Sequence, residues 1–66
     1  MFPKVGDITN AEVISAEKTY AIVELDCGYT ACLPGRGYIE GEVVEVRVTG
    51  IEESRRAQPN LTIEAV

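Results

Sequence analysis

The chain has 66 residues, which is enough for one domain, and a domain of this size buries only about 60% of the surface that its unfolded form exposes. Six Lys and Arg stand against eleven Asp and Glu, and the net charge of -5 disfavours tight, sequence-independent binding to a phosphate backbone. The hydrophobic fraction of 45% argues against a disordered tail. No apolar run approaches the roughly 20 residues of a transmembrane helix.

The first residues, MFPKVGD, lead directly into a predicted strand and do not resemble a signal peptide, so we expect a cytoplasmic location. The first predicted strand covers residues 7–15, and the second covers residues 19–25. In the first strand the apolar positions Ile8, Ala11, Val13 and Ile14 are not strictly alternate. This change of phase predicts a β-bulge near Ala11.

Residues 20–35, YAIVELDCGYTACLPG, predict a β-hairpin. Ala21, Val23 and Leu25 alternate with Tyr20, Ile22 and Glu24, which is the two-residue period of a strand buried on one face. The segment Asp26-Cys27-Gly28 supplies the turn, in which Gly28 is free to adopt a positive φ. The third strand follows Gly28 and ends at Pro34-Gly35.

Three glycines and a proline between Pro34 and Gly41 predict a loop with at most one helical turn. The fourth strand, residues 42–51, is the clearest because Val44, Val46 and Val48 occupy alternate positions and β-branched residues favour strands. A charged turn follows at residues 52–56, and the fifth strand covers residues 60–65.

Five short strands without a helical period predict an all-β domain spanning residues 1–66, a small five-stranded antiparallel Greek-key barrel of the OB type. An SH3-like barrel is the alternative, because its strands are similar in number and length. The predicted core consists of ten aliphatic residues: Ile8, Val13, Ala21, Val23, Leu25, Val44, Val46, Val48, Leu61 and Ile63.

With its strands placed, the chain resembles the S-one domain, an RNA-binding OB-fold named after a ribosomal protein. The segments that carry the resemblance are VGDITNAEV, TYAIVEL, GYTACLP, GEVVEVRVTGIE and NLTIEAV, which cover almost the whole chain. The hairpin VELDCGYTACLPG is also similar to bacterial translation initiation factor one. The resemblance implies binding of RNA in translation or RNA metabolism.

The outer face of the second strand is the candidate nucleic-acid surface. Tyr20 and Ile22 should face outward, because the alternate residues Ala21, Val23 and Leu25 face the interior. An aromatic residue on this outer face can stack on a base, which contributes about 1–3 kcal/mol to binding. Lys18 and Arg47 are expected to flank this surface. The alternative is that Tyr20 covers the barrel mouth and the charged groups are simply solvated.

Tyr38 and Arg36 in the glycine-rich loop are the remaining candidates for RNA contact. An exposed aromatic residue in such a loop binds a ligand or caps the end of a barrel, and Arg36 pairs with a phosphate or with a nearby carboxylate. Local packing with an ion pair is the more frequent of these arrangements. Arg55 and Arg56 directly follow two glutamates and are interpreted as a solvated turn.

Two cysteines without any histidine cannot complete a four-ligand zinc site within one chain. We expect reduced thiols, with Cys32 as a small packing residue and Cys27 in the turn, while a cross-strand disulfide or redox chemistry is the alternative. Neither a metal nor another cofactor is expected.

The sequence has no residue pattern that favours an enzyme. It predicts a small module that binds single-stranded RNA weakly through strands two and three. The net charge of -5, and an isoleucine where the family has its second aromatic residue, favour an alternative function. In that alternative, the chain is an acidic adaptor that uses the same barrel face to bind a basic protein and regulate an RNA-handling enzyme or complex.

Overall fold

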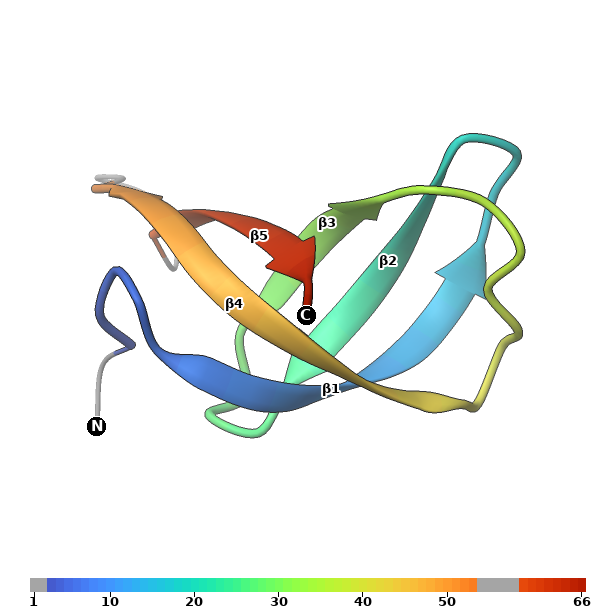
Figure 1. The fold of residues 1–66 in the computed structure, drawn as a ribbon, viewed down its shortest axis with the longest axis horizontal. Coiled ribbons are helices and arrows are strands. Elements are labelled where there is room, and N and C mark those ends of the chain that lie inside the picture. Colours follow the sequence, from blue (N-terminus) through green and yellow to red (C-terminus); the bar gives the residue numbers. More distant parts are fainter. Residues whose placement is uncertain (1–2, 54–58) are drawn as a thin grey trace.

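The computed structural model describes residues 3–53 and 59–66. Five strands make up the fold: β1 (Ile8–Ala16), β2 (Tyr20–Leu25), β3 (Thr30–Pro34), β4 (Val43–Glu52) and β5 (Asn60–Ala65). They close into a barrel in the order β1-β2-β3-β5-β4, with β4 returning to β1 (Figure 1). The observed bounds lie within a residue or so of the predicted ones. The predicted charged turn at residues 52–56, including Arg55 and Arg56, falls largely outside the described residues.

The sheet is mixed, and the prediction of a purely antiparallel barrel is wrong in this respect. Strand β3 pairs with β5 in parallel, through Cys32 and Thr62, whereas the other four strand pairs are antiparallel. The reason is geometric: strand directions can alternate around a closed ring only when the number of strands is even. A closed barrel of five strands therefore contains at least one parallel neighbour pair. The all-β, five-stranded, OB-like barrel itself is confirmed.

The barrel interior is filled by small and medium aliphatic side chains. Alternation along each strand directs every second residue inward, as in β2, where Ala21, Val23 and Leu25 are buried. Among the described residues the buried core is entirely hydrophobic. It consists of Ala11, Val13, Ala21, Val23, Leu25, Ala31, Leu33, Val46, Val48, Leu61 and Ile63.

Two predicted core residues and the predicted bulge need correction. Ile8 faces outward and is 50% exposed, because the inward positions Ala11 and Val13 direct Thr9, and not Ile8, towards the interior. Val44 is partly buried and packs against the rim of the core. The bulge lies between Val13 and Ser15 and not near Ala11. A second irregularity lies between Val48 and Gly50 of β4.

The hairpin turn between β2 and β3 forms as its sequence predicts. The amide of Gly28 donates to the carbonyl oxygen of Leu25 at 2.8 Å, and the amide of Leu25 donates to the carbonyl oxygen of Tyr29 at 2.7 Å. Gly28 has a φ of 93°, which completes a three-residue loop of a kind common in hairpins. Within the described residues, no segment forms a helix of the length and apolarity needed to cross a membrane.

Candidate nucleic-acid interface

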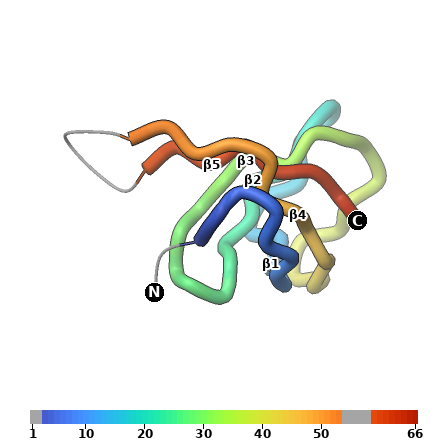
Figure 2. The backbone as a smooth tube through the Cα atoms, turned by 60° about the vertical axis from the view of Figure 1, so that its left-hand side comes forward, coloured from blue at the N-terminus to red at the C-terminus, as the bar shows by residue number. Residues whose placement is uncertain are grey.

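One end of the barrel is formed by two loops that are distant in the sequence. The amide of Gly35, in the loop between β3 and β4, donates to the carbonyl oxygen of Thr19, in the turn between β1 and β2, at 2.9 Å. Directly beside this bond, Tyr20 of β2 is paired with Pro34 of β3. Both loops project beyond the strands at the same end of the molecule (Figures 1 and 2).

Two cations belong to these loops. Lys18 precedes Thr19 and Arg36 follows Gly35, so each is one residue from the hydrogen bond that joins the loops. Both residues are exposed. We call Lys18, Tyr20, Pro34 and Arg36 the barrel-end cluster. Its members come from two separate parts of the chain, residues 18–20 and 34–36, and the loop–loop hydrogen bond brings these segments together.

Tyr20 and Ile22 lie on the outer face of β2, as their alternation predicts. Tyr20 is 38% exposed, whereas Ile22 is half-buried between Ser15 of β1 and Cys32 of β3. An exposed tyrosine beside two loops that each carry a cation combines the two elements that single-stranded nucleic acids require, a stacking surface and positive charge. The outer row continues through Cys32 to Thr62 and is uncharged.

Tyr38 lies inside this end of the barrel and not on its outer surface. It is half-buried and packs against the core. A Cβ atom added to Gly35 would lie 3.0 Å from Cε2 and 3.1 Å from Oη of Tyr38, so the ring lies directly over the glycine. Two roles were predicted for Tyr38, ligand binding and capping of the barrel end, and this geometry corresponds to capping. Tyr38 thus supports the loop from which Arg36 projects.

Arg47 does not flank Tyr20. It lies on β4 opposite Ile8, at the first residue of β1, whereas the hairpin around Tyr20 adjoins the last residues of β1. On the other side of the closed barrel, β3 and β5 lie between the two residues, so they are three strand spacings apart, roughly 15 Å. Alternation along β2 and β4 places both Tyr20 and Arg47 on the outside of the barrel. The strand order keeps them apart, because β2 and β4 are not neighbours.

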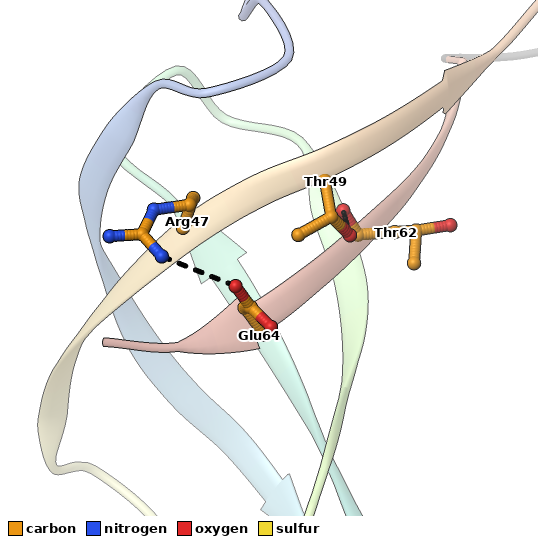
Figure 3. Close-up of polar contacts among 4 residues, drawn as sticks. All are labelled: Arg47, Thr49, Thr62 and Glu64. Atoms are coloured by element: carbon orange, nitrogen blue, oxygen red, sulfur yellow. Dashed lines mark hydrogen bonds and ion pairs between the residues drawn. The ribbon is translucent and has the colours of Figure 1, made fainter.

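The side chain of Arg47 also has a partner of its own. Its Nη1 lies 3.3 Å from Oε1 of Glu64 on the neighbouring strand β5 (Figure 3). Close by, the hydroxyl of Thr49 donates to the carbonyl oxygen of Thr62 at 3.1 Å. Both charged side chains are about half exposed, and ion pairs of this kind contribute little to stability. The carboxylate nevertheless neutralises much of the positive charge of Arg47.

Cys32 occupies an outer position of β3, so the prediction of a packing role is wrong. Ala31 and Leu33 face the interior, and the residue between them must face outward. Cys27 lies in the hairpin turn, as predicted. Both cysteines are free and exposed, in agreement with the predicted free thiols.

The opposite half of β2 is acidic on its outer face. Glu24 lies directly across from Glu12 of β1, and like charges in this arrangement destabilise a sheet. Asp26 follows in the turn, and its amide donates to the carbonyl oxygen of Asn10 at 3.1 Å. Asn10 in turn is paired with Glu45 of β4. We call Glu12, Glu24, Asp26 and Glu45 the acidic face.

A shallow hollow of about 320 Å³ opens on the acidic face. It is lined by Ala11, Glu12, Glu24, Leu25, Asp26, Gly28 and Val43. Within the part of the chain that the structure describes, no three His, Cys, Asp or Glu side chains converge closely enough to hold a metal ion.

Sequence reasoning missed Pro34 and Cys32 as parts of the outer surface next to Tyr20. The alternation along β3 was the signal that could have placed both residues outward. The chain matches no protein-family model, no curated protein and no solved structure. The functional argument therefore depends on the geometry of these two surfaces.

Proposed function

We propose that this protein is a small nucleic-acid-binding module that binds single-stranded RNA weakly through the barrel-end cluster and the adjoining outer face of β2 and β3. The observation that carries the proposal is the hydrogen bond between Gly35 and Thr19. Because of this bond, Lys18 and Arg36 belong to adjoining loops beside the exposed ring of Tyr20. The resemblance to the S-one domain supports the same function, in translation or RNA metabolism.

The expected affinity is modest. A net charge of -5 opposes the approach of a polyanion, and only two cations belong to the cluster. Dissociation constants of roughly 1 to 100 µM are typical of RNA or DNA binding that depends on a few phosphate contacts. Base stacking on Tyr20 should contribute about 1–3 kcal/mol to the binding free energy.

A titration of isotope-labelled protein with hexauridylate at low salt tests the proposal. The NMR signals of Lys18, Tyr20, Ile22 and Arg36 should shift together, because stacking and phosphate contact occur on one surface. Tyr20→Ala should weaken binding about 5- to 100-fold, whereas Tyr20→Phe keeps the ring and should retain most of the affinity. If saturating hexauridylate moves none of the four signals, the proposal is wrong.

Two arginine variants provide a matched test of the electrostatic contribution. Arg36→Ala should reduce the slope of log affinity against log salt by about 0.7, the value for one phosphate contact on a single strand. Arg47→Ala removes the same charge from a position three strand spacings from Tyr20, roughly 15 Å, where Glu64 already pairs with it, so it should reduce the slope less than Arg36→Ala does. Equal effects of the two variants would indicate that only the net charge matters.

A basic protein is the second candidate partner, and the acidic face favours it. Three carboxylates surround the hollow of about 320 Å³, which suits the Lys or Arg side chains of an adaptor's partner. In that case a lysine-rich peptide should shift the signals of Glu12, Glu24 and Asp26, and hexauridylate should shift none. The two candidates thus predict different surfaces in the same experiment.

A further inference from the structure

Three exposed aliphatic side chains come together beside the start of β4. Ile14, Ile39 and Val43 are all exposed, the last two to 69% and 64%. Val43 is paired with Glu12 of β1, and Ile14 follows Glu12 by two residues. Val43 and Ile14 are thus diagonal neighbours of one strand pair, and such positions are about 7–8 Å apart. One ligand can therefore contact both side chains.

Backbone hydrogen bonds bring the third side chain to the same place. The amide of Gly41 donates to the carbonyl oxygen of Val13 at 2.8 Å, so the loop before β4 runs alongside the end of β1 (Figure 1). Glu42 closes a turn with Ile39, because its amide donates to the carbonyl oxygen of Ile39 at 3.0 Å. Its Oε1 also accepts from the amide of Ile39 at 2.7 Å. We call Ile14, Ile39 and Val43 the aliphatic patch.

The bulge in β1 explains why an isoleucine is exposed here. The register between β1 and β2 shifts between Val13, which is buried opposite Val23, and Ser15, which is opposite the outward Ile22. Ile14 is therefore the extra residue of the bulge, and it remains on the outside. Single exposed aliphatic residues are common on protein surfaces, but contiguous ones typically mark an interaction surface.

The aliphatic patch lies in the most acidic part of the chain. Its residues belong to the segments 5–17 and 37–46, which contain six Asp and Glu and no Lys or Arg. These segments carry a charge of -6, whereas the rest of the chain, with five Asp and Glu and six Lys and Arg, carries +1. Val43 also lines the hollow of about 320 Å³ together with Glu12, Glu24 and Asp26. A ligand that covers the patch therefore meets carboxylates at its border.

We infer that the aliphatic patch and its bordering carboxylates form a docking surface for a basic amphipathic segment of a partner protein. The apolar side chains of this segment cover Ile39 and Val43, and its Lys or Arg side chains pair with Glu12 and the other carboxylates of the hollow. The inference goes beyond the proposed function, because it requires neither RNA nor the barrel-end cluster. It also differs from the binding of a basic protein by the acidic face alone, since apolar contact supplies part of the affinity.

Charge disfavours the other occupants of this surface. Two copies of the chain joined through the patch would bring the carboxylates at the border of each copy together, and like charges across an interface oppose association. The same carboxylates repel the phosphates of a nucleic acid. A basic amphipathic segment offers complementary charge together with apolar contact, so it matches both properties of the surface.

The test uses two short synthetic peptides of equal charge. The lysine–leucine peptide alternates pairs of Lys and Leu, and in the lysine–serine peptide Ser replaces every Leu. Fluorescence anisotropy measures the affinity of each peptide, and NMR of the labelled protein locates the contact. The lysine–leucine peptide should shift the signals of Ile14, Ile39 and Val43, and it should bind about tenfold more tightly than the lysine–serine peptide.

Two double variants with the same pair of exchanges test the apolar contact. Ile39→Thr/Val43→Thr removes apolar surface from the patch and keeps β-branched side chains. Val5→Thr/Ile8→Thr makes matching changes at exposed residues, with Ile8 roughly 13 Å from Val43 along the pair of β1 and β4. The patch variant should weaken the lysine–leucine peptide about five- to twentyfold, and the control variant less than about twofold.

A second pair of variants tests the carboxylates. Glu12→Gln/Glu45→Gln removes two charges beside Val43, whereas Glu52→Gln/Glu53→Gln removes two charges at the other end of β4. The first variant should weaken the lysine–leucine peptide more than the second at low salt, and the difference should fall as salt screens the charges. Equal weakening by the two variants would overturn the inference, because net charge alone would then explain the attraction.

Three further results would overturn the inference. Equal affinity of the two peptides would show that apolar contact contributes nothing. Dimerisation of the protein that Ile39→Thr/Val43→Thr abolishes would assign the patch to a second copy. Weaker binding of hexauridylate to the same variant would assign it to RNA. Thermal unfolding confirms that each variant is folded, and the comparison of the two peptides on the wild type decides the inference even if a variant does not fold.

Discussion

The barrel-end cluster and the acidic face share strand β2 but differ in what they offer a ligand. At the start of the strand, Tyr20 is exposed beside Lys18 and Arg36, whereas Glu24 near its end is opposite Glu12. Both halves bury the same kind of aliphatic residue on the inner face. Because outward positions are not constrained by the core, one strand can attract a polyanion at one end and repel it at the other.

The two regions are also held in different ways. The acidic face lies on regular strand pairs, where the register between β1 and β2 forces two carboxylates together. The barrel-end cluster depends on loops, through the hydrogen bond from Gly35 to Thr19 and the ring of Tyr38 over Gly35. A rigid scaffold that positions functional loops is a common arrangement in binding proteins. We therefore expect the cluster to be the more sensitive region to loop mutations.

The largest effect is expected for the core that both regions share. Val46 is completely buried in β4, and Val46→Ala should lower the free energy of unfolding by roughly 1–3 kcal/mol through lost burial and a residual cavity. Val43→Ala, at a position that is 64% exposed on the same strand, should change it by less than about 0.5 kcal/mol. Denaturant unfolding measures both. Similar losses at the two positions would contradict the inward phase of β4.

An intermediate effect should distinguish the loop-based region. Gly35 has a φ of 135° and lies under the ring of Tyr38, whereas Gly37 has a φ of 83° with open space around it. Both Gly→Ala changes incur the cost of a positive φ, about 1–2 kcal/mol. Gly35→Ala should in addition displace the tyrosine ring and shift the NMR signals of Thr19 and Tyr20. If Gly37→Ala shifts these signals equally, Tyr38 does not support the cluster.

The smallest effect should appear on the acidic face, and with the opposite sign. Glu24→Lys replaces a like-charge pair with Glu12 by an attractive one, which should raise the free energy of unfolding by about 0.2–1 kcal/mol. Glu45→Lys, opposite the neutral Asn10, makes the same change in charge without removing a like-charge pair. Thermal unfolding at low salt should show a larger gain for Glu24→Lys. An equal gain would reflect net charge alone.

Much of the local structure was predictable from the residues alone. Alternating side chains determine which face of a strand is buried, because a shift of the pairing by one residue would move every apolar side chain to the solvent face. This rule placed Tyr20 and Ile22 outward, and it identified Val46 and Val48 as core residues. The turn at Gly28 was predictable for a similar reason, since only local backbone geometry is involved.

The tertiary structure decided which outward residues share a surface. Closure of five strands imposed one parallel pair, which the strand order placed between β3 and β5, and the same order placed Arg47 beside Glu64 and three strand spacings from Tyr20. It also brought Arg36 towards Lys18 through the bond between Gly35 and Thr19. These relations join residues that are distant along the chain. Periodicity describes only one strand at a time, so it cannot specify the register and order through which such residues meet.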